Sequence, residues 1–404
     1  MKNLSAAQIA LLSALNREQC RLPKRLSMTG GVFAPDAQAA VARAIERVFI
    51  RHRTVGGTVA LVRGGCLAGV FPYGLARLPD VPAAVDTLYR VASVSKLTLS
   101  FGVLKLVEEG TLALDMDIGE VLGYRVRNPA YAHTPITPRQ LMTHTAGLMD
   151  APQYDGPGIA GRLALRDMLT GEGAARNFAP TSPGTVFRYS NFGAGILGSL
   201  MEKATGEPFD LVMDRALFAP LGMTAGYAPQ RLLPHAGRLA SGYAVRPLRK
   251  PRLVYDAPAI VAQSTPGVDA ERHFMASPGR LLITAPDAAR LARLLCSDGE
   301  IDGVRVLSPA SMAQMRQRQA SIASVPGDAG RGLNVAFAPR VFGRPNVIGH
   351  QGVAYGMNAE LWADPDTGDA VVMATSGTAL LPVGDLVHCG WQMVCLGFAA
   401  LGGR

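Results

Sequence analysis

The sequence TLYRVASVSK, residues 87–96, predicts a strand that passes directly into a helix. Its first half, Thr87 to Val91, combines β-branched and aromatic residues, which favour a strand. From Ser93 to Glu109 apolar residues recur at helical spacing, namely Leu97, Phe101, Leu104 and Val107. Gly110 is a natural stop for this helix. The stretch therefore places a serine at the start of a helix that has a buried face.

Further strands and helices surround this stretch on both sides in the sequence. Before it, periodicity predicts a helix over Pro35 to Arg51 and a β-hairpin whose turn contains Arg63-Gly64-Gly65. The strands of this hairpin are Thr58 to Val62 and Gly69 to Tyr73. Beyond the middle of the chain we expect a helix, four strands and a terminal helix, at residues 285–296, 332–338, 346–350, 358–362, 370–375 and 387–403.

The order of these elements predicts an α+β fold. The region from Thr111 to about Tyr227 has frequent Pro and Gly and reads as short helices and loops. The simplest arrangement is one antiparallel sheet built from both chain ends, flanked by the terminal helices, with an inserted mainly helical lobe. We expect a discontinuous α/β lobe at residues 30–110 and 265–404, a helical lobe with loops at 111–264, and an N-terminal extension at 1–29. A site would form in the cleft between the lobes.

The composition excludes several classes of protein. Of 404 residues, 48% are apolar and 18% charged, which guarantees a sizeable core and excludes disordered, collagen-like and coiled-coil chains. Much of the net charge of +9 lies in Arg17 to Arg25 and Arg246 to Arg252, which lack the aromatic residues that stack on bases. We therefore expect no nucleic-acid partner. Five scattered cysteines without a C-x-x-C pair indicate neither a disulfide framework nor a structural zinc site.

Neither chain end carries a convincing export or membrane signal. Residues 2–15 resemble a signal peptide only faintly, because Gln8 and Ser13 interrupt the apolar run and no small-residue cleavage site follows. A short amphipathic helix is the favoured interpretation. The segment Val387 to Gly403 is too short for a membrane span and fits a helix packed on a sheet. We expect a cytoplasmic protein without stable membrane insertion, with a periplasmic or secreted location as the alternative.

Ser93-Val94-Ser95-Lys96 has the spacing of a nucleophile and its base on a helix. Residues three apart share a helix face, so Lys96 would project beside Ser93. A serine hydroxyl needs a neighbouring base, and a lysine amine can be one when burial and other cations favour its neutral form. Backbone N–H groups at the helix N-terminus can hold an oxyanion. Alone the motif is weak, since about one S-x-x-K arises by chance in such a chain, and an N-cap serine with an exposed lysine remains the alternative.

A second motif, Tyr189-Ser190-Asn191, can complete this chemistry. If the backbone is extended, the phenol and the amide of this motif face the same cleft. A tyrosine near lysine cations ionises more readily and can move a proton between Ser93 and a leaving group. Asn191 can hold Lys96 in place and bind a substrate amide. A third motif, His350-Gln351-Gly352, lies on a predicted late strand, where Gly352 would let a substrate backbone approach closely.

The three motifs together resemble those of the serine β-lactamase and penicillin-binding protein superfamily. The resemblance is to the group that includes class C β-lactamases, D-alanyl-D-alanine carboxypeptidases and β-lactamase-like esterases. The motifs occur in that family's order and with compatible separations. Flanking stretches agree as well, at residues 89–92, 141–148, 220–223 and 277–279. The similarity covers about residues 36–398 and implies a β-lactamase/transpeptidase-like fold.

The resemblance also implies catalytic and substrate-binding roles, without a metal ion or another cofactor. Ser93 would be the acylated nucleophile, Lys96 its partner, and Tyr189 the general base that later serves as the acid. Substrate binding would fall to the Asn191 amide, to His350 in the third motif, and to Gly352. The oxyanion hole would consist of the backbone N–H groups of Ser93 and Val353.

His350 stands where class C β-lactamases usually have lysine, while some D,D-peptidases and esterases of the group have histidine. A mostly neutral imidazole is a poorer clamp for a carboxylate than an ammonium group. We therefore expect weak β-lactam hydrolysis at most. Pro278-Gly279 also departs from the two glycines that the family often has there, which alters the wall of the site.

Other motifs favour structural interpretations. Gly193 to Gly198 matches a dinucleotide-binding pattern, but no acidic-ended second strand follows, so close helix packing explains these glycines better. His144 is expected to be a packing residue. Trp362 and Tyr355 follow the third motif, and both an acyl-pocket role and a core or rim role remain open for them.

The sequence thus predicts a serine hydrolase that acts through an acyl-serine intermediate. Its expected partner is a small-molecule ester, amide or peptide substrate, as for an esterase or a D-amino-acid peptidase. One alternative is a penicillin-binding or sensory protein that acylates without useful turnover. Another is a transacylase, in which a second alcohol replaces water. The physiological substrate and the oligomeric state stay open.

Overall fold

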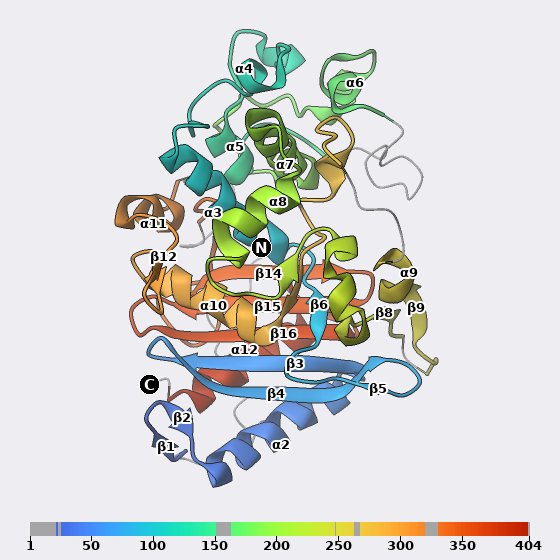
Figure 1. Cartoon of the computed structure of the whole chain (residues 1–404), viewed down its shortest axis with the longest axis vertical. Helices are drawn as coiled ribbons and strands as arrows, with labels where there is room; N and C mark the ends of the chain where they lie inside the picture. The colour runs from blue at the N-terminus through green and yellow to red at the C-terminus, as the bar shows by residue number, and fades with distance from the viewer. Residues whose placement is uncertain are drawn as a thin grey trace.

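A seven-stranded antiparallel sheet lies at the centre of the computed structural model, which describes residues 22, 26–150, 163–246, 248–261, 267–319 and 330–402 (Figure 1). The strand order is β13-β14-β15-β16-β3-β4-β5. The strands are β3 (Gly56–Arg63), β4 (Cys66–Arg77), β5 (Val81–Pro82), β13 (Ala336–Phe337), β14 (Ile348–Ala354), β15 (Met357–Asp364) and β16 (Asp369–Gly377). Antiparallel pairing of β16 with β3 joins the two ends of the chain, which confirms the predicted sheet.

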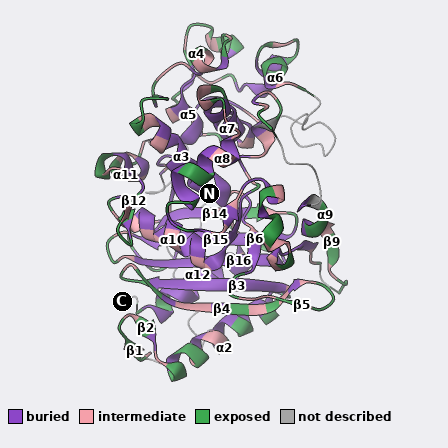
Figure 2. Ribbon diagram, viewed as in Figure 1, coloured by how far each residue is buried: buried purple, intermediate pink, exposed green. Residues whose placement is uncertain are grey.

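Helices cover both faces of this sheet. On one face α2 (Pro35–Arg51) and α12 (His388–Ala400) share a core with Val59 and Leu61 of β3. On the other face α10 (Ala285–Cys296) and α3 (Val94–Glu108) share a core with Ala60 and Val62. Alternate residues of a strand point to opposite faces, and β3 is buried along almost its whole length because both faces are covered (Figure 2).

The terminal helix α12 packs on β15 and β16, as expected for the segment that begins at Val387. No helix within the described ranges is long and apolar enough to cross a membrane. The short amphipathic helix expected near the N-terminus lies outside the described residues, as does most of the basic segment from Arg17 to Arg25.

Helices, most of them short, gather at the end of the molecule opposite α2 (Figure 1). They are α4 (Ile118–Leu122), α5 (Pro138–Met142), α6 (Leu165–Thr170), α7 (Asn191–Thr205) and α8 (Phe209–Met213). The hairpin of β8 (Gly242–Ala244) and β9 (Arg252–Tyr255) falls within the expected helical segment 111–264, yet β8 packs against β15 and β16. The division of the chain into two lobes by residue number stays a prediction.

One predicted strand differs from the structure. Residues 332–338 contribute only the two residues of β13, because Asn334 has a φ of 55° and its N–H donates to the Met142 carbonyl at 2.8 Å. The segment from Thr185 to Tyr189, which leads to the second motif, is irregular. Its Arg188 N–H donates to the His144 carbonyl at 2.7 Å, so this segment pairs with a loop rather than with a strand.

The glycines of the dinucleotide-like motif lie inside α7 and serve packing. A Cβ atom at Gly195 would lie 2.2 Å from the Phe274 carbonyl oxygen. At Gly198 it would lie 2.7 Å from the Ser277 Oγ. These contacts let α7 approach the segment that leads to Pro278.

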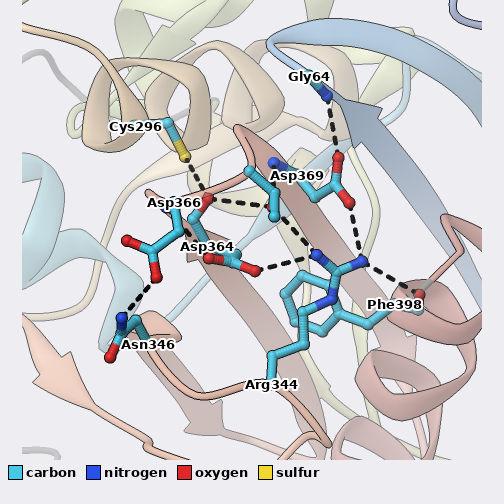
Figure 3. Close-up of polar contacts among 9 residues, drawn as sticks. Gly64, Cys296, Arg344, Asn346, Asp364, Asp366, Asp369 and Phe398 are labelled. Carbon is cyan, nitrogen blue, oxygen red and sulfur yellow. Dashed lines mark hydrogen bonds and ion pairs between the residues drawn. The ribbon is translucent and has the colours of Figure 1, made fainter. Parts of the chain in front are cut away.

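A buried arginine joins three parts of the sheet layer (Figure 3). Arg344 donates to Asp364 Oδ2 at 3.0 Å and to Asp369 Oδ2 at 2.8 Å, and all three side chains are buried. It also donates to the Phe398 carbonyl of α12 at 3.5 Å. Asp369 in turn accepts from the Gly64 N–H in the β3–β4 turn at 2.9 Å. The cluster fastens the β15–β16 turn to α12 and to the N-terminal hairpin.

Removal of this arginine is expected to cost far more stability than removal of an exposed one. Arg344→Met leaves two buried carboxylates without their cation, which lowers the free energy of unfolding by about 3–5 kcal/mol. Arg305 pairs with Asp298 and Glu300 on the surface, so Arg305→Met is the matched control and costs at most about 1 kcal/mol. Urea unfolding followed by circular dichroism measures both losses, and equal losses would contradict the role given to the Arg344 cluster.

Candidate active site

Ser93 lies at the junction between strand β6 (Leu88–Arg90) and helix α3. Strand β6 pairs with β10 (Leu282–Thr284), and the Val91 N–H donates to the Leu281 carbonyl at 3.0 Å. Between strand and helix, Ala92 has a φ of 45°, a strained conformation that persists only where the surroundings hold it. This turn makes Ser93 the N-cap residue of α3.

Three predicted catalytic residues meet at the Ser93 hydroxyl. Lys96 Nζ donates to Ser93 Oγ at 3.0 Å, and the Tyr189 hydroxyl lies 2.9 Å from the same oxygen. Lys96 Nζ is also 5.1 Å from the centroid of the Tyr189 ring. Lys96 is fully buried, whereas Tyr189 is 37% exposed. The hydroxyl therefore has two ionisable groups within hydrogen-bond distance, one from inside the protein and one from the solvent side.

Lys96 is held by a backbone carbonyl. Its Nζ donates to the Pro278 carbonyl oxygen at 2.8 Å. The sequence suggested that Asn191 would hold this lysine, but the Asn191 amide donates elsewhere in the structure. Pro278 follows Ser277, whose hydroxyl donates to two carbonyls of α7, Ala194 at 3.2 Å and Gly195 at 3.3 Å. The packing of α7 thus determines where the carbonyl that binds Lys96 lies.

Asp150 holds Asn191 and was not identified from the sequence. Asn191 Nδ2 donates to Asp150 Oδ2 at 2.7 Å. The same carboxylate accepts from the Ser190 hydroxyl at 3.0 Å and from the N–H groups of Asn191 and Phe192 at 3.0 and 2.9 Å. Ser190 is extended and caps α7, so Asp150 binds the segment that carries Tyr189 at the point where the helix begins. A carboxylate at a helix N-terminus is stabilised by the free N–H groups there.

His350 lies on β14 and is neutral. Burial, reinforced by the positive charges of Lys96 and Arg331, lowers the pKa of His350 to about 3. Its Nδ1 lies 2.6 Å from the Gln351 carbonyl oxygen, which can only accept, so the proton is on Nδ1. Nε2 is left as an acceptor. The third motif therefore offers a hydrogen-bond acceptor where a lysine would offer a cationic donor.

Gly352 allows β14 to pack against the backbone before Ser93. A Cβ atom at Gly352 would lie 2.1 Å from the Val91 carbonyl oxygen and 3.1 Å from the Ser93 nitrogen. The close approach expected at this glycine is therefore made by the chain itself. Strand β13 pairs only with Ile348 and Gly349, so the edge of β14 beyond them faces the Ser93 segment. That the N–H of the next residue, Val353, completes an oxyanion hole with that of Ser93 stays a prediction.

Arg331 is a second residue that the sequence did not point to. Its guanidinium carbon lies 5.1 Å from the centroid of the Phe187 ring. Burial lowers the pKa of Arg331, while Tyr189 and Asp385 act in the opposite direction. Its charge also lowers the pKa of His144 and His350. Arg331 therefore adds positive charge to the same site as Lys96.

His144 packs beneath the tyrosine of the second motif. Its ring centroid is 4.5 Å from that of Tyr189, and its Nδ1 accepts from the Ser190 N–H at 3.3 Å. Burial and the nearby cations hold the pKa of His144 well below its usual value, so the ring is neutral. These contacts give His144 the packing role expected from the sequence.

The two aromatic residues whose roles the sequence left open lie in different environments in the structure. Trp362 is buried, donates from Nε1 to Glu360 Oε2 at 2.7 Å, and has its ring centroid 4.9 Å from that of Phe342, so it is a core residue. Tyr355 is 54% exposed in the turn between β14 and β15, and its ring centroid lies 4.7 Å from the Arg90 guanidinium carbon, so it is not a core residue. In the part of the chain that the structure describes, no three His, Cys, Asp or Glu side chains are grouped as a metal ion would require.

Comparison with known proteins identifies the family. A model of the beta-lactamase family matches residues 38–385. The chain belongs to the beta-lactamase family. This beta-lactamase-family protein is 29% identical over 344 residues to Penicillin-binding protein 4 of Amycolatopsis lactamdurans, covering 81% of this chain and 82% of that protein. It is 36% identical over 212 residues to esterase EstB of Burkholderia gladioli, a match that covers 49% of this chain and 54% of the esterase.

Solved structures of the beta-lactamase fold agree with this membership. EstCE1, described as a hydrolase with promiscuous acyltransferase activity, superposes with a TM-score of 0.70 at 23% identity, covering 91% of this chain and 99% of EstCE1. The D-amino acid amidase of Ochrobactrum anthropi superposes with a TM-score of 0.67 at 22% identity, covering 91% and 97% of the two chains. At these identities the two structures show a shared fold. Family and fold together make the protein a β-lactamase-related serine hydrolase.

We expect Asp150→Asn to weaken both the stability and the chemistry of this beta-lactamase-family protein. An amide has one acceptor oxygen in place of two and cannot accept all four hydrogen bonds, which costs about 1–3 kcal/mol of unfolding free energy. Because the Tyr189 segment is then less well held, kcat for an ester substrate should fall about 10-fold. Thermal unfolding and ester kinetics measure the two effects. An unchanged kcat would show that Asp150 only stabilises the fold.

His350 should make the protein less stable in acid. Its pKa is about 3 in the folded state against 6.5 as its ordinary value, so between these values the unfolded state binds more protons. The free energy of unfolding is therefore expected to fall as the pH drops below about 6.5, by up to about 1.4 kcal/mol per pH unit. His350→Gln should flatten this slope, while the same change at the exposed His133 should not. Urea unfolding at several pH values measures these slopes. If both variants kept the wild-type slope, His350 would not be the cause of the lower stability in acid.

Proposed function

We propose that the protein hydrolyses small-molecule esters or amides through an acyl-enzyme formed on Ser93. The observation that carries this proposal is the position of Ser93 Oγ, 3.0 Å from Lys96 Nζ and 2.9 Å from the Tyr189 hydroxyl. Such a pair can take the serine proton as the oxygen attacks a carbonyl carbon. Membership of the beta-lactamase family and the esterase relative support the same reading.

In the proposed acylation, Ser93 Oγ forms a bond to the carbonyl carbon of the substrate. For this step Tyr189 reacts as the phenolate: the serine proton passes to its oxygen, and the positive charge of Lys96 beside both oxygens stabilises the negative charge. The carbonyl oxygen becomes an oxyanion, held by the N–H groups of Ser93 and Val353. When the intermediate collapses, the bond to the leaving alcohol or amine breaks, and Tyr189 returns the proton to that leaving group.

Deacylation uses the same groups in the same order. A water molecule attacks the acyl carbon and loses a proton to Tyr189 as the second tetrahedral intermediate forms. Collapse of this intermediate releases the acid, and the proton moves from Tyr189 to Ser93 Oγ. Because Tyr189 is partly exposed, water can reach the acyl carbon from the solvent side of the site.

The neutral imidazole of His350 supports an ester or a D-amino-acid amide or peptide over a β-lactam as substrate. An acceptor at Nε2 does not attract a substrate carboxylate as an ammonium group does. We also propose a cytoplasmic location, on the sequence features alone, and cell fractionation tests it. This location would favour a small ester or peptide over cell-wall material.

The second candidate function is covalent penicillin binding without useful turnover. It is favoured by the 29% identity to Penicillin-binding protein 4, which extends over 81% of this chain. The two candidates share the acylation step and differ in the rate at which water removes the acyl group.

Incubation with p-nitrophenyl esters of several chain lengths and with a fluorescent penicillin distinguishes the two functions. We expect steady ester turnover and a weak or short-lived penicillin label. Ser93→Ala should abolish turnover, a loss of at least about 1,000-fold, because the covalent route is removed. The exposed Ser27 provides the matched control, Ser27→Ala, which should keep full activity.

Mass spectrometry of the peptide that contains Ser93 identifies the acylated residue. A stable penicillin adduct on Ser93 with no ester turnover would favour the second function over the first. The absence of both turnover and adduct in the wild-type protein would refute acyl-serine chemistry altogether.

A further inference from the structure

Arg90 contacts three segments that surround the nucleophile, and the mechanism above gives it no role. It is the last residue of β6, three positions before Ser93. Its Nε donates to the Gly279 carbonyl oxygen at 2.8 Å. Its guanidinium carbon lies 4.7 Å from the ring centroid of Tyr355 and 5.2 Å from that of Tyr255. The guanidinium group is thus bound by a carbonyl and by two aromatic rings.

Two of these contacts lead to groups that the proposed reaction uses. Gly279 follows Pro278, whose carbonyl accepts from Lys96 Nζ at 2.8 Å. Tyr355 lies two residues after Val353, which supplies one half of the proposed oxyanion hole. Arg90 itself is joined through Val91 and Ala92 to Ser93, which supplies the other half. A single side chain therefore connects the segment that binds Lys96, both proposed oxyanion donors and the nucleophile.

Ion pairing does not explain the position of Arg90. Across the described ranges, no carboxylate forms an ion pair with it, and its charge acts to lower the pKa of Tyr255 and of a second cation, Arg280. A guanidinium group placed near a second one needs compensation, which the Gly279 carbonyl and the faces of the two tyrosine rings supply. The contacts are directional, so a lysine ammonium group could not make all three at once.

The conformation of Tyr355 also indicates a specific contact. Its φ is 52°, in the left-handed region that bulky residues rarely adopt. The turn cannot relax easily, because a Cβ atom at the next residue, Gly356, would lie 2.1 Å from the Tyr243 carbonyl oxygen. The half-exposed ring in this turn packs against the Arg90 guanidinium group.

We propose that Arg90 is a positioning residue for the catalytic centre, which holds the Pro278–Gly279 segment and the Tyr355 turn at fixed distances from Ser93. The inference rests on the proposed function of Ser93. Without the guanidinium group, the Val353 N–H and the Pro278 carbonyl are free to move relative to the nucleophile. A displacement of about 1 Å of such groups slows chemistry about 100-fold while leaving ground-state binding largely intact.

The test compares Arg90→Met and Arg90→Lys with Tyr355→Ala and Tyr355→Phe. Arg166→Met is the matched control, because Arg166 also lies over a tyrosine ring, that of Tyr124 at 4.6 Å, at α6. Two readouts are taken on the full-length protein. The first is kcat and KM for the p-nitrophenyl ester that the wild type turns over fastest. The second is amide hydrogen exchange, followed by mass spectrometry of peptides that cover residues 276–284 and 348–357.

We expect Arg90→Met and Tyr355→Ala to lower kcat about 10- to 100-fold with KM changed less than about 3-fold. Exchange should become faster in both peptides and stay unchanged elsewhere. Tyr355→Phe keeps the ring and should retain most of the wild-type kcat, whereas Arg90→Lys keeps only the charge and should fall between wild type and Arg90→Met. Arg166→Met should match the wild type in both readouts.

Three results would overturn the proposal. The first is an unchanged kcat in Arg90→Met. The second is a change confined to KM in Tyr355→Ala, which would make Tyr355 a substrate contact. The third is faster exchange over the whole chain, which would make Arg90 a general stabilising residue. If the wild type neither turns over an ester nor forms a Ser93 adduct, the proposed function fails. Hydrogen exchange in the Arg90 variants then decides the positioning role by itself, since unchanged exchange in both peptides would refute it.

Discussion

The burial of the Lys96 amine is the constraint on which the rest of the site depends. A buried amine is costly unless its N–H groups find acceptors. Here the acceptors are the Ser93 hydroxyl and the Pro278 carbonyl, and each comes from a different direction. The first requires the strained turn at Ala92, and the second requires α7 to pack closely on the segment before Pro278. The reactive geometry therefore depends directly on how the helical region packs.

The sheet also positions the site, because it joins distant parts of the chain. Strand β14 must pass within van der Waals distance of the Ser93 segment, and only a glycine at position 352 permits this. Because β14 reaches the N-terminal hairpin through β15, β16 and β3, its position depends on pairing between the two ends of the chain. The site forms only when nearly the whole chain has folded.

Features with a local pattern could be predicted from the sequence, and features that depend on tertiary contacts could not. The bounds of α2 and α10 were predictable because apolar periodicity and a proline in the first turn mark them. Ser93, Lys96 and Tyr189 were identifiable by their motifs. Asp150 and Arg331 have no motif, since their partners lie far along the chain. Trp362 could not be assigned because every residue of β15 is buried, so the strand has no alternation that distinguishes its two faces.

The same fold holds two buried cations in opposite ways. Arg344 is paired with two buried aspartates, and its charge is compensated within the sheet layer. Lys96 has no carboxylate within ion-pair distance among the described residues, and it contacts the Ser93 hydroxyl, the Pro278 carbonyl and the Tyr189 ring. A carboxylate beside Lys96 would compensate its charge and so weaken the stabilisation that Lys96 gives to negative charge on the Ser93 and Tyr189 oxygens. Neutral His350 and His144 avoid adding further charge. The uncompensated amine is thus the arrangement that a serine nucleophile needs, and it is tolerated because clusters such as that of Arg344 stabilise the surrounding fold.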